Sequence, residues 1–312
     1  SKNGIAFVTP ADLDGDHISD YVYAGDVYGN VWRFDLTSQD PNSWSVSTTP
    51  LFTTSAGQPI TSKVIVASVP GSGLGGPARL IVSFGTGQAF PATLTSPATY
   101  ATANQALYGI WDWNMDGWNA IAPSTAKYAS LASSAGPSGG IVASKDLRQQ
   151  TSTDAGTSTS GLAQRTVTSS KVCWKGSTDC AGSNSDFGWT LPLPTGQNEQ
   201  VVYSPSLQYG VVNVNTLIPA VQQVLSCNTT AASGFSYGIS VANGGATANP
   251  YFYDKDGSFL TSGGQGVSAV GMSGTGTSTF VSLNGKVYAV MQGSDGTPRF
   301  IQINPSATAI GS

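Results

Sequence analysis

Four aspartates recur at alternate positions near the start of the chain. They are Asp12, Asp14, Asp16 and Asp20, the first, third, fifth and ninth residues of the loop 12–20. Calcium takes about six to eight oxygen ligands in a flexible shell, and alternate carboxylates on a curved loop can converge on one ion. The seventh residue, Ile18, would contribute its backbone carbonyl. This spacing predicts a Ca²⁺ site with Asp12, Asp14, Asp16, Ile18 and Asp20 as ligands.

The loop differs from an EF-hand in three ways. Its sixth place holds His17 instead of glycine, and the twelfth place is Tyr23 instead of a bidentate glutamate, so Asp20 must close the shell. The flanking residues 5–8 and 21–24 are rich in β-branched and aromatic types. We therefore expect the loop to join two strands, with the His17 side chain facing solvent.

Composition favours an all-β chain and excludes some function classes. Among 312 residues there are 38 Gly, only 10% charged residues and the single glutamate Glu199, so residues that stabilise exposed helices are scarce. A net charge of −4 without a basic cluster argues against nucleic acid. No apolar run is long enough to cross a bilayer as a helix. The start, Ser1 to Gly4, leads straight into a strand-like run, which predicts that the chain begins inside a longer protein.

Short strand-like runs recur along the chain. The runs 29–34, 104–111 and 284–290 each pass from a polar turn to a strand that carries aromatic residues. Such recurrence is typical of the blades of a β-propeller. We expect one propeller-type domain over residues 1–312, with surface insertions near 124–140 and 151–170 and a flexible tail at 305–312.

The cysteines indicate an oxidising compartment. Cys173 and Cys180 are separated by six residues, a spacing that suits a disulfide across a hairpin in an exported protein. Cys227 is left over, and either pairs outside this segment or stays buried and reduced. Three cysteines and one histidine, scattered this widely, do not form a zinc pattern.

No catalytic residue and no organic cofactor site are assigned from the sequence. The only histidine, His17, lies in the acidic loop, so a Ser-His-Asp or Cys-His arrangement is hard to build. The segment from Asp112 to Asp116 has three ligands of a calcium loop but ends on Ala120 at the ninth place. We expect turns both there and at 254–257, and a second ion at Asp112–Asp116 stays open.

An aromatic cluster lies near the middle of the chain. Tyr108 and Trp111 have the pattern of core residues. Trp113 and Trp118 stand beside polar residues, so they could pack in the core, stack on a sugar or anchor a partner protein.

The loop 12–20 and the hairpin 23–36 together resemble the C-terminal domain of the PilC/PilY type IV pilus-tip adhesins. Matching segments follow in the same order at 84–87, 107–112 and 188–205, and the resemblance weakens after Pro250. It implies a modified quinoprotein-like β-propeller with one calcium loop between strands. Family domains carry further blades before that loop, whereas eleven residues precede Asp12 here, so we expect only the C-terminal blades of the propeller.

The resemblance also implies a function. It predicts an exported protein that reaches the pilus tip and cell surface through the periplasm and outer membrane, contacting minor pilins and a host-cell or abiotic surface. Calcium occupancy would tune pilus extension against retraction and twitching motility, and the protein would not be an enzyme. There is no Arg-Gly-Asp triplet to support an integrin-type contact.

Two other classes of function remain open at this point. An exported quinoprotein-like dehydrogenase should cluster Arg, Glu and Trp around a redox cofactor, but Glu199 stands alone. A lectin-like module would use Trp113 and Trp118 to stack on carbohydrate.

Overall fold

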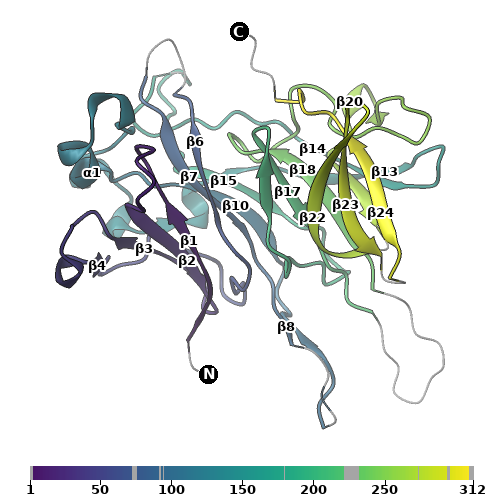
Figure 1. The fold of residues 1–312 in the computed structure, drawn as a ribbon, viewed down its shortest axis with the longest axis horizontal. Coiled ribbons are helices and arrows are strands. Elements are labelled where there is room, and N and C mark those ends of the chain that lie inside the picture. The colour runs from purple at the N-terminus through teal and green to yellow at the C-terminus, as the bar shows by residue number, and fades with distance from the viewer. Residues whose placement is uncertain are drawn as a thin grey trace.

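The chain folds almost entirely into β-sheets in a computed structural model (Figure 1). The structure describes residues 3–71, 76–90, 93, 95–178, 180–220, 232–272, 274–293 and 296–308. Four larger sheets form a four-blade β-propeller arrangement, which confirms the predicted fold class. In Figure 1 the first sheet lies at the left and the last at the right, with the other two between them.

The first two sheets contain the strands up to the middle of the chain. The first has the order β1-β2-β3-β5-β11, with β4 paired to β3, and the second has the order β12-β15-β10-β7-β6. The first comprises β1 (Ile5–Ala11), β2 (Tyr21–Asp26), β3 (Asn30–Asp35), β4 (Ser45–Val46), β5 (Phe52–Thr53) and β11 (Val142–Ala143). The second comprises β6 (Ile65–Val69), β7 (Arg79–Gly85), β10 (Ala106–Trp111), β12 (Arg148–Gln149) and β15 (Gly188–Pro192).

The third and fourth sheets complete the array. The third has the order β13-β14-β21-β18-β17-β16, and the fourth has the order β22-β23-β24. Their strands are β13 (Ser152–Thr157), β14 (Ala163–Val167), β16 (Ser206–Gln208), β17 (Val211–Asn215), β18 (Gly234–Ser240), β21 (Ala269–Met272), β22 (Gly274–Leu283), β23 (Lys286–Gly293) and β24 (Pro298–Ile303). Two small hairpins pair β8 (Ala89–Phe90) with β9 (Thr99–Tyr100) and β19 (Thr261–Ser262) with β20 (Gln265–Gly266).

Helical structure is short throughout the described ranges. It consists of α1 (Asp116–Ile121) and the 3₁₀ turns η1 (Pro41–Ser43), η2 (Ser124–Ala126), η3 (Ser133–Ala135), η4 (Ser138–Gly140) and η5 (Ser144–Asp146). Within those ranges no helix has the length and apolar character needed to span a membrane.

The strand sequences explain their places in the sheets. Every residue of β7 and β10 is buried, because these strands are interior to the second sheet and neighbouring sheets cover both their faces. Between β22 and β23, Asn284 and Gly285 both have positive φ angles, of 52° and 75°. This is the backbone that a two-residue Asn-Gly hairpin turn requires.

Two apolar clusters hold the sheets together. The larger joins the first three sheets, where the ring of Tyr108 lies 5.1 Å from Phe52 and 5.4 Å from Phe84. The smaller lies between the third and fourth sheets and includes Val270 and Ile301. Burial of such side chains stabilises the fold by roughly 1.5–3 kcal/mol each.

Two segments expected at the surface are partly built into the fold. Residues 151–170 contain β13 and β14, and β14 pairs with β21 inside the third sheet, because Arg165 forms buried polar contacts and Val167 packs in the core. The tail is also packed as far as Thr308: Ala307 is fully buried and its carbonyl accepts from Asn249 N–H. Residues 309–312 lie outside the described ranges.

Trp113 and Trp118 belong to the core. They are 5% and 2% exposed, and the Trp118 Nε1 donates to the carbonyl of Ala126. Their polar sequence neighbours did not indicate this burial. Of the three alternatives left open for these tryptophans, the structure shows core packing, and their burial leaves no ring face for a sugar.

A buried carboxylate organises the β2–β3 hairpin. Asp26, 1% exposed, accepts hydrogen bonds from the backbone N–H groups of Tyr28 and Asn30 and from the side chains of Asn3, Asn30 and Trp32. Desolvation raises the pKa of Asp26, but these donors outweigh it and lower the pKa overall. The ionised carboxylate therefore stabilises the hairpin.

We predict that Asp26→Asn lowers the free energy of unfolding by about 2 kcal/mol at neutral pH, because hydrogen bonds to a charged acceptor are lost. The pKa of Asp26 in the folded state is below the ordinary value of 3.8. This stabilisation is therefore complete above pH 3.8 and is lost as the pH falls through the pKa of the folded state. Urea unfolding from pH 7 to pH 3 measures it. The free energy of unfolding of Asp26→Asn should depend less on pH than that of the wild type. The control, Asp40→Asn at an exposed position, should keep the pH dependence of the wild type.

A buried ion pair ties the segment after β15 to the third sheet. The Arg165 Nη1 lies 2.6 Å from Glu199 Oε2, and the Thr216 hydroxyl donates to Glu199 Oε1 at 2.6 Å. Arg165 also donates to Tyr237 and to Asp154. Both carboxylate oxygens of Glu199, the single glutamate, therefore bind other residues of the fold.

Glu199→Ala should lower the free energy of unfolding by about 3–5 kcal/mol, because it leaves the Arg165 guanidinium buried without its closest carboxylate. The double variant Arg165→Met, Glu199→Leu should lose less free energy of unfolding than Glu199→Ala, since neither charge of the pair remains buried. Thermal and urea unfolding measure both. A double variant as unstable as Glu199→Ala would contradict this interpretation.

Candidate calcium site in the β1–β2 loop

The acidic loop 12–20 connects two paired strands. Ala11 at the end of β1 is paired with Tyr21 at the start of β2, and the Asp20 N–H donates to the Ala11 carbonyl at 2.9 Å. The strands on either side are those that the flanking β-branched and aromatic residues predict. The pairing of β1 with β2 therefore fixes both ends of the loop.

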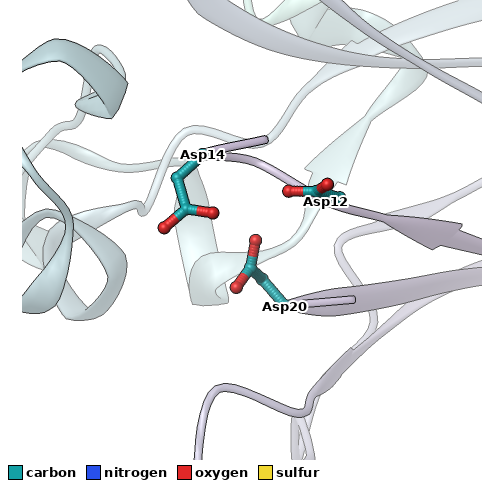
Figure 2. A group of neighbouring side chains, drawn as sticks. All are labelled: Asp12, Asp14 and Asp20. Carbon is teal, nitrogen blue, oxygen red and sulfur yellow. The ribbon is translucent and has the colours of Figure 1, made fainter. Parts of the chain in front are cut away.

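Three of the predicted ligands converge in space. Carboxylate oxygens of Asp12, Asp14 and Asp20 all lie within 4.8 Å of one another. Figure 2 shows the three carboxylates turned toward a common centre. Among the described residues this is the one group of three or more His, Cys, Asp or Glu side chains with such spacing.

Asp16 is not part of this group. Its carboxylate accepts a hydrogen bond from the Ile18 N–H at 2.7 Å, which holds it in a local turn. Asp16 is exposed and lies on the same short loop. Giving up this one hydrogen bond would free its carboxylate for an ion.

Backbone donors position the loop carboxylates. Asp12 accepts from the N–H groups of Gly15 at 2.7 Å and His17 at 2.9 Å, and Asp20 Oδ2 accepts from the Leu13 N–H at 2.6 Å. Desolvation raises the pKa of Asp12, but the donated hydrogen bonds outweigh it and lower this pKa. The loop thus favours the charged form of its first aspartate.

Asp20 has the opposite environment. Desolvation and the charges of Asp14, Asp12 and Asp16 raise its pKa, although the Leu13 N–H opposes them. Like charges are crowded around a partly buried carboxylate, which is unfavourable without a counter-charge. An all-oxygen set of this kind fits a hard divalent cation such as Ca²⁺.

His17 adopts a backbone conformation that glycine usually provides. Its φ angle is +72°, in the left-handed region, and Gly15 has a φ of +82°. A non-glycine residue in this region is strained by about 1–2 kcal/mol. The sixth place of the loop therefore has the backbone that favours glycine, although the residue there is histidine.

Hydrogen bonds and an ion pair attach β2 and β3, which follow the loop, to the second sheet. Tyr23 donates its hydroxyl hydrogen to Asp112 Oδ2 at 2.6 Å, and the Arg33 Nη1 lies 2.7 Å from Asp112 Oδ1. Desolvation opposes the charge on Arg33, but Asp112 outweighs it and raises the pKa of Arg33. Sequence reasoning missed this contact, because nothing in the spacing of positions 23, 33 and 112 links them.

The other acidic motifs form no comparable group. Asp112 is committed to Arg33 and Tyr23, whereas Asp116 accepts from the Ser130 hydroxyl. Asp254 pairs with Ser258 across a turn that Gly257 closes. A second calcium loop at Asp112–Asp116 is therefore not formed by the described side chains.

The predicted disulfide between Cys173 and Cys180 is present, with a Cα–Cα distance of 5.6 Å. It closes the turn that contains Trp174, which packs against Trp111 in the core. Cys227 lies outside the described residues.

The fold and the loop define the class of protein: a β-propeller domain with an acidic loop between its first two strands. The family model described as "PilY1 beta-propeller domain" matches residues 1–132. The chain is therefore similar to PilY1 proteins, which confirms the resemblance found in its sequence.

Several curated relatives are similar to most of this chain. A type IV pilus biogenesis factor PilY1 homolog of Xylella fastidiosa is 28% identical over 87% of this chain and 16% of its own length. The type IV pilus biogenesis factor PilY1 of Pseudomonas aeruginosa is 29% identical over 88% of this chain and 25% of its own length. The chain thus spans a quarter or less of these relatives.

The fold likeness extends along nearly the whole chain. The crystal structure of the Pseudomonas aeruginosa PilY1 C-terminal domain matches with a TM-score of 0.68 at 24% identity, covering 98% of this chain and 61% of that one. The fold resemblance therefore continues past Pro250, where the sequence resemblance weakens.

We predict that His17→Gly raises the free energy of unfolding by about 1 kcal/mol, because glycine adopts a positive φ without steric strain. Thermal unfolding without added calcium measures the change. Ser19→Gly, in the same loop but without a positive φ, is the control and should be neutral or destabilising. A His17→Gly variant less stable than wild type would show that the imidazole itself stabilises the loop.

Proposed function

We propose that the chain is a non-enzymatic, calcium-binding propeller domain of a type IV pilus biogenesis factor. The observation that carries the calcium assignment is the convergence of Asp12, Asp14 and Asp20 within 4.8 Å. Asp16 and the Ile18 carbonyl complete the proposed ligand set, as the loop spacing predicts. Bound Ca²⁺ would supply the positive charge that offsets the mutual repulsion of these carboxylates.

The residues of the loop would couple ion binding to local order. Asp12 directly follows β1 and Asp20 directly precedes β2, so an ion bound by both carboxylates would fix the two ends of the loop. Asp16 would exchange its hydrogen bond from Ile18 for a place in the ligand set. The backbone donors of Leu13, Gly15 and His17 keep the remaining carboxylate oxygens oriented.

The effect of the loop would reach the second sheet through β2. Tyr21, next to Asp20, packs edge-on against Trp118 of α1 at 6.2 Å between ring centroids. Tyr23, on the same face of β2, is hydrogen-bonded to Asp112. A loop that is ordered by calcium would therefore stabilise the contact between the first two sheets.

The wider role follows from the family and remains part of the proposal. The relatives are described as type IV pilus biogenesis factors, which supports an exported protein at the pilus tip, and the disulfide is compatible with an oxidising compartment. Its partners would be minor pilins and a host-cell or abiotic surface. Calcium occupancy would tune pilus extension against retraction and thereby twitching motility.

A quinoprotein-like dehydrogenase is less well supported. Arg165 and Glu199, which such a site could have used, are buried against each other and against Thr216 and Tyr237. Their polar atoms are engaged in holding the third sheet. No specific observation favours this second function.

Isothermal titration should detect one Ca²⁺ per chain, with a dissociation constant of about 10⁻⁵ to 10⁻³ M, as in many extracellular calcium modules and sensors. Asp12→Ala and Asp20→Ala should each weaken binding by about tenfold or more, since each removes a charged ligand. Saturating calcium should stabilise the wild type by about 2.7 kcal/mol at one hundred times the dissociation constant.

The matched control is Asp256→Ala, which removes another exposed aspartate from a turn. It should leave calcium affinity unchanged. The loop assignment is wrong if Asp12→Ala and Asp20→Ala bind Ca²⁺ as tightly as the wild type. In cells, the two loop variants should alter twitching motility while the control does not.

A further inference from the structure

Residues of β23 and β24 line a groove. These strands lie at the opposite end of the molecule from β1 and β2, which flank the acidic loop (Figure 1). The lining of this groove includes Tyr253, Lys255, Lys286, Tyr288, Phe300 and Gln302, which we call the β24 groove. Its volume is about 610 Å³. Ligand sites of proteins commonly have volumes of about 300–1,000 Å³.

Strand alternation places these side chains on one face. On β23, Val287 and Ala289 are buried while Lys286 and Tyr288 are not, and on β24 Ile301 is buried between Phe300 and Gln302. Tyr288 is paired with Gln302. Tyr253 extends the same sheet, since its N–H donates to the Gln302 carbonyl at 3.0 Å. The aromatic and polar side chains therefore form a row across the sheet.

The aromatic part of this face is exposed. Phe300 is 64% exposed, and the ring of Tyr253 is stacked on Phe259 at 4.4 Å with Phe259 itself 43% exposed. Large aromatic side chains are usually buried, and an exposed group of them commonly marks a binding surface. Flat rings on a rigid sheet can stack against the apolar face of a ring-shaped ligand.

The polar part of the groove is biased toward positive charge. Its lining contains Lys255 and Lys286, and Arg299 on the other side of β24 from Phe300, against the carboxylates of Asp254 and Asp256, in a chain of net charge −4. Both carboxylates are engaged: Asp254 accepts from Ser160 and Thr159, and Asp256 accepts from Ser258. Among the described residues, neither Lys255 nor Lys286 forms an ion pair.

We propose that the β24 groove binds an acidic oligosaccharide. The rings of Tyr288 and Phe300 would stack on sugar rings, the Gln302 amide would hydrogen-bond sugar hydroxyls, and the two lysines would face carboxylate or sulfate groups. An apolar protein partner fits less well, because Lys286, Gln302 and Lys255 interrupt the aromatic surface. This site is separate from the calcium loop and does not depend on it.

An array of uronate-containing, sialylated and sulfated oligosaccharides, with neutral oligosaccharides beside them, tests the proposal on the 312-residue chain. At least one acidic oligosaccharide should bind, and titration with it should show a loss of about tenfold or more in Phe300→Ala and in Lys286→Gln, from lost stacking and lost charge. Both side chains are exposed, so these variants should fold.

The control is Phe90→Ala, which removes an aromatic side chain of similar exposure, 55%, from β8. It should bind as the wild type does, and so should Asp12→Ala, which separates this site from the calcium loop. The proposal is overturned if no acidic oligosaccharide binds at millimolar concentration, or if neutral ones bind equally well. It is also overturned if Phe300→Ala and Lys286→Gln leave affinity unchanged, or if Phe300→Ala only converts an oligomer to a monomer.

Discussion

The contact between Arg33, Asp112 and Tyr23 fixes how the first two sheets meet. A carboxylate that is 1% exposed is stable only because a guanidinium at 2.7 Å and a tyrosine hydroxyl at 2.6 Å satisfy it. Arg33 and Tyr23 belong to the hairpin that follows the acidic loop, whereas Asp112 follows β10. The contact therefore sets the position of the loop relative to the body of the molecule.

A second buried ion pair has a similar role elsewhere in the molecule. Arg165 and Glu199 tie the segment after β15 to the third sheet, much as Arg33 and Asp112 tie the first sheet to the second. Apolar side chains supply most of the favourable free energy between sheets, while each buried ion pair is satisfied by several donors and specifies one arrangement. A molecule assembled in this way can hold an exposed, highly charged loop without disturbing its core.

Sequence alone predicted the all-β class, the acidic loop with its two flanking strands and the disulfide, since each depends on residues close together in the chain. It left open or missed features that depend on distant neighbours. The tryptophans at 113 and 118 are buried by other segments, and β14 is recruited into a sheet by pairing with β21. The loop geometry was only partly predictable: spacing placed Asp12, Asp14 and Asp20 together, but the Ile18 N–H holds Asp16 away.

Anomalous X-ray diffraction from crystals grown with Ca²⁺ would test the central claim most directly, because it locates the ion without reference to affinity. We predict one anomalous peak between the carboxylates of Asp12, Asp14 and Asp20, with Asp16 released from Ile18 and the Ile18 carbonyl turned toward the ion. The absence of a peak there at saturating calcium, or a peak at another group of residues, would contradict it.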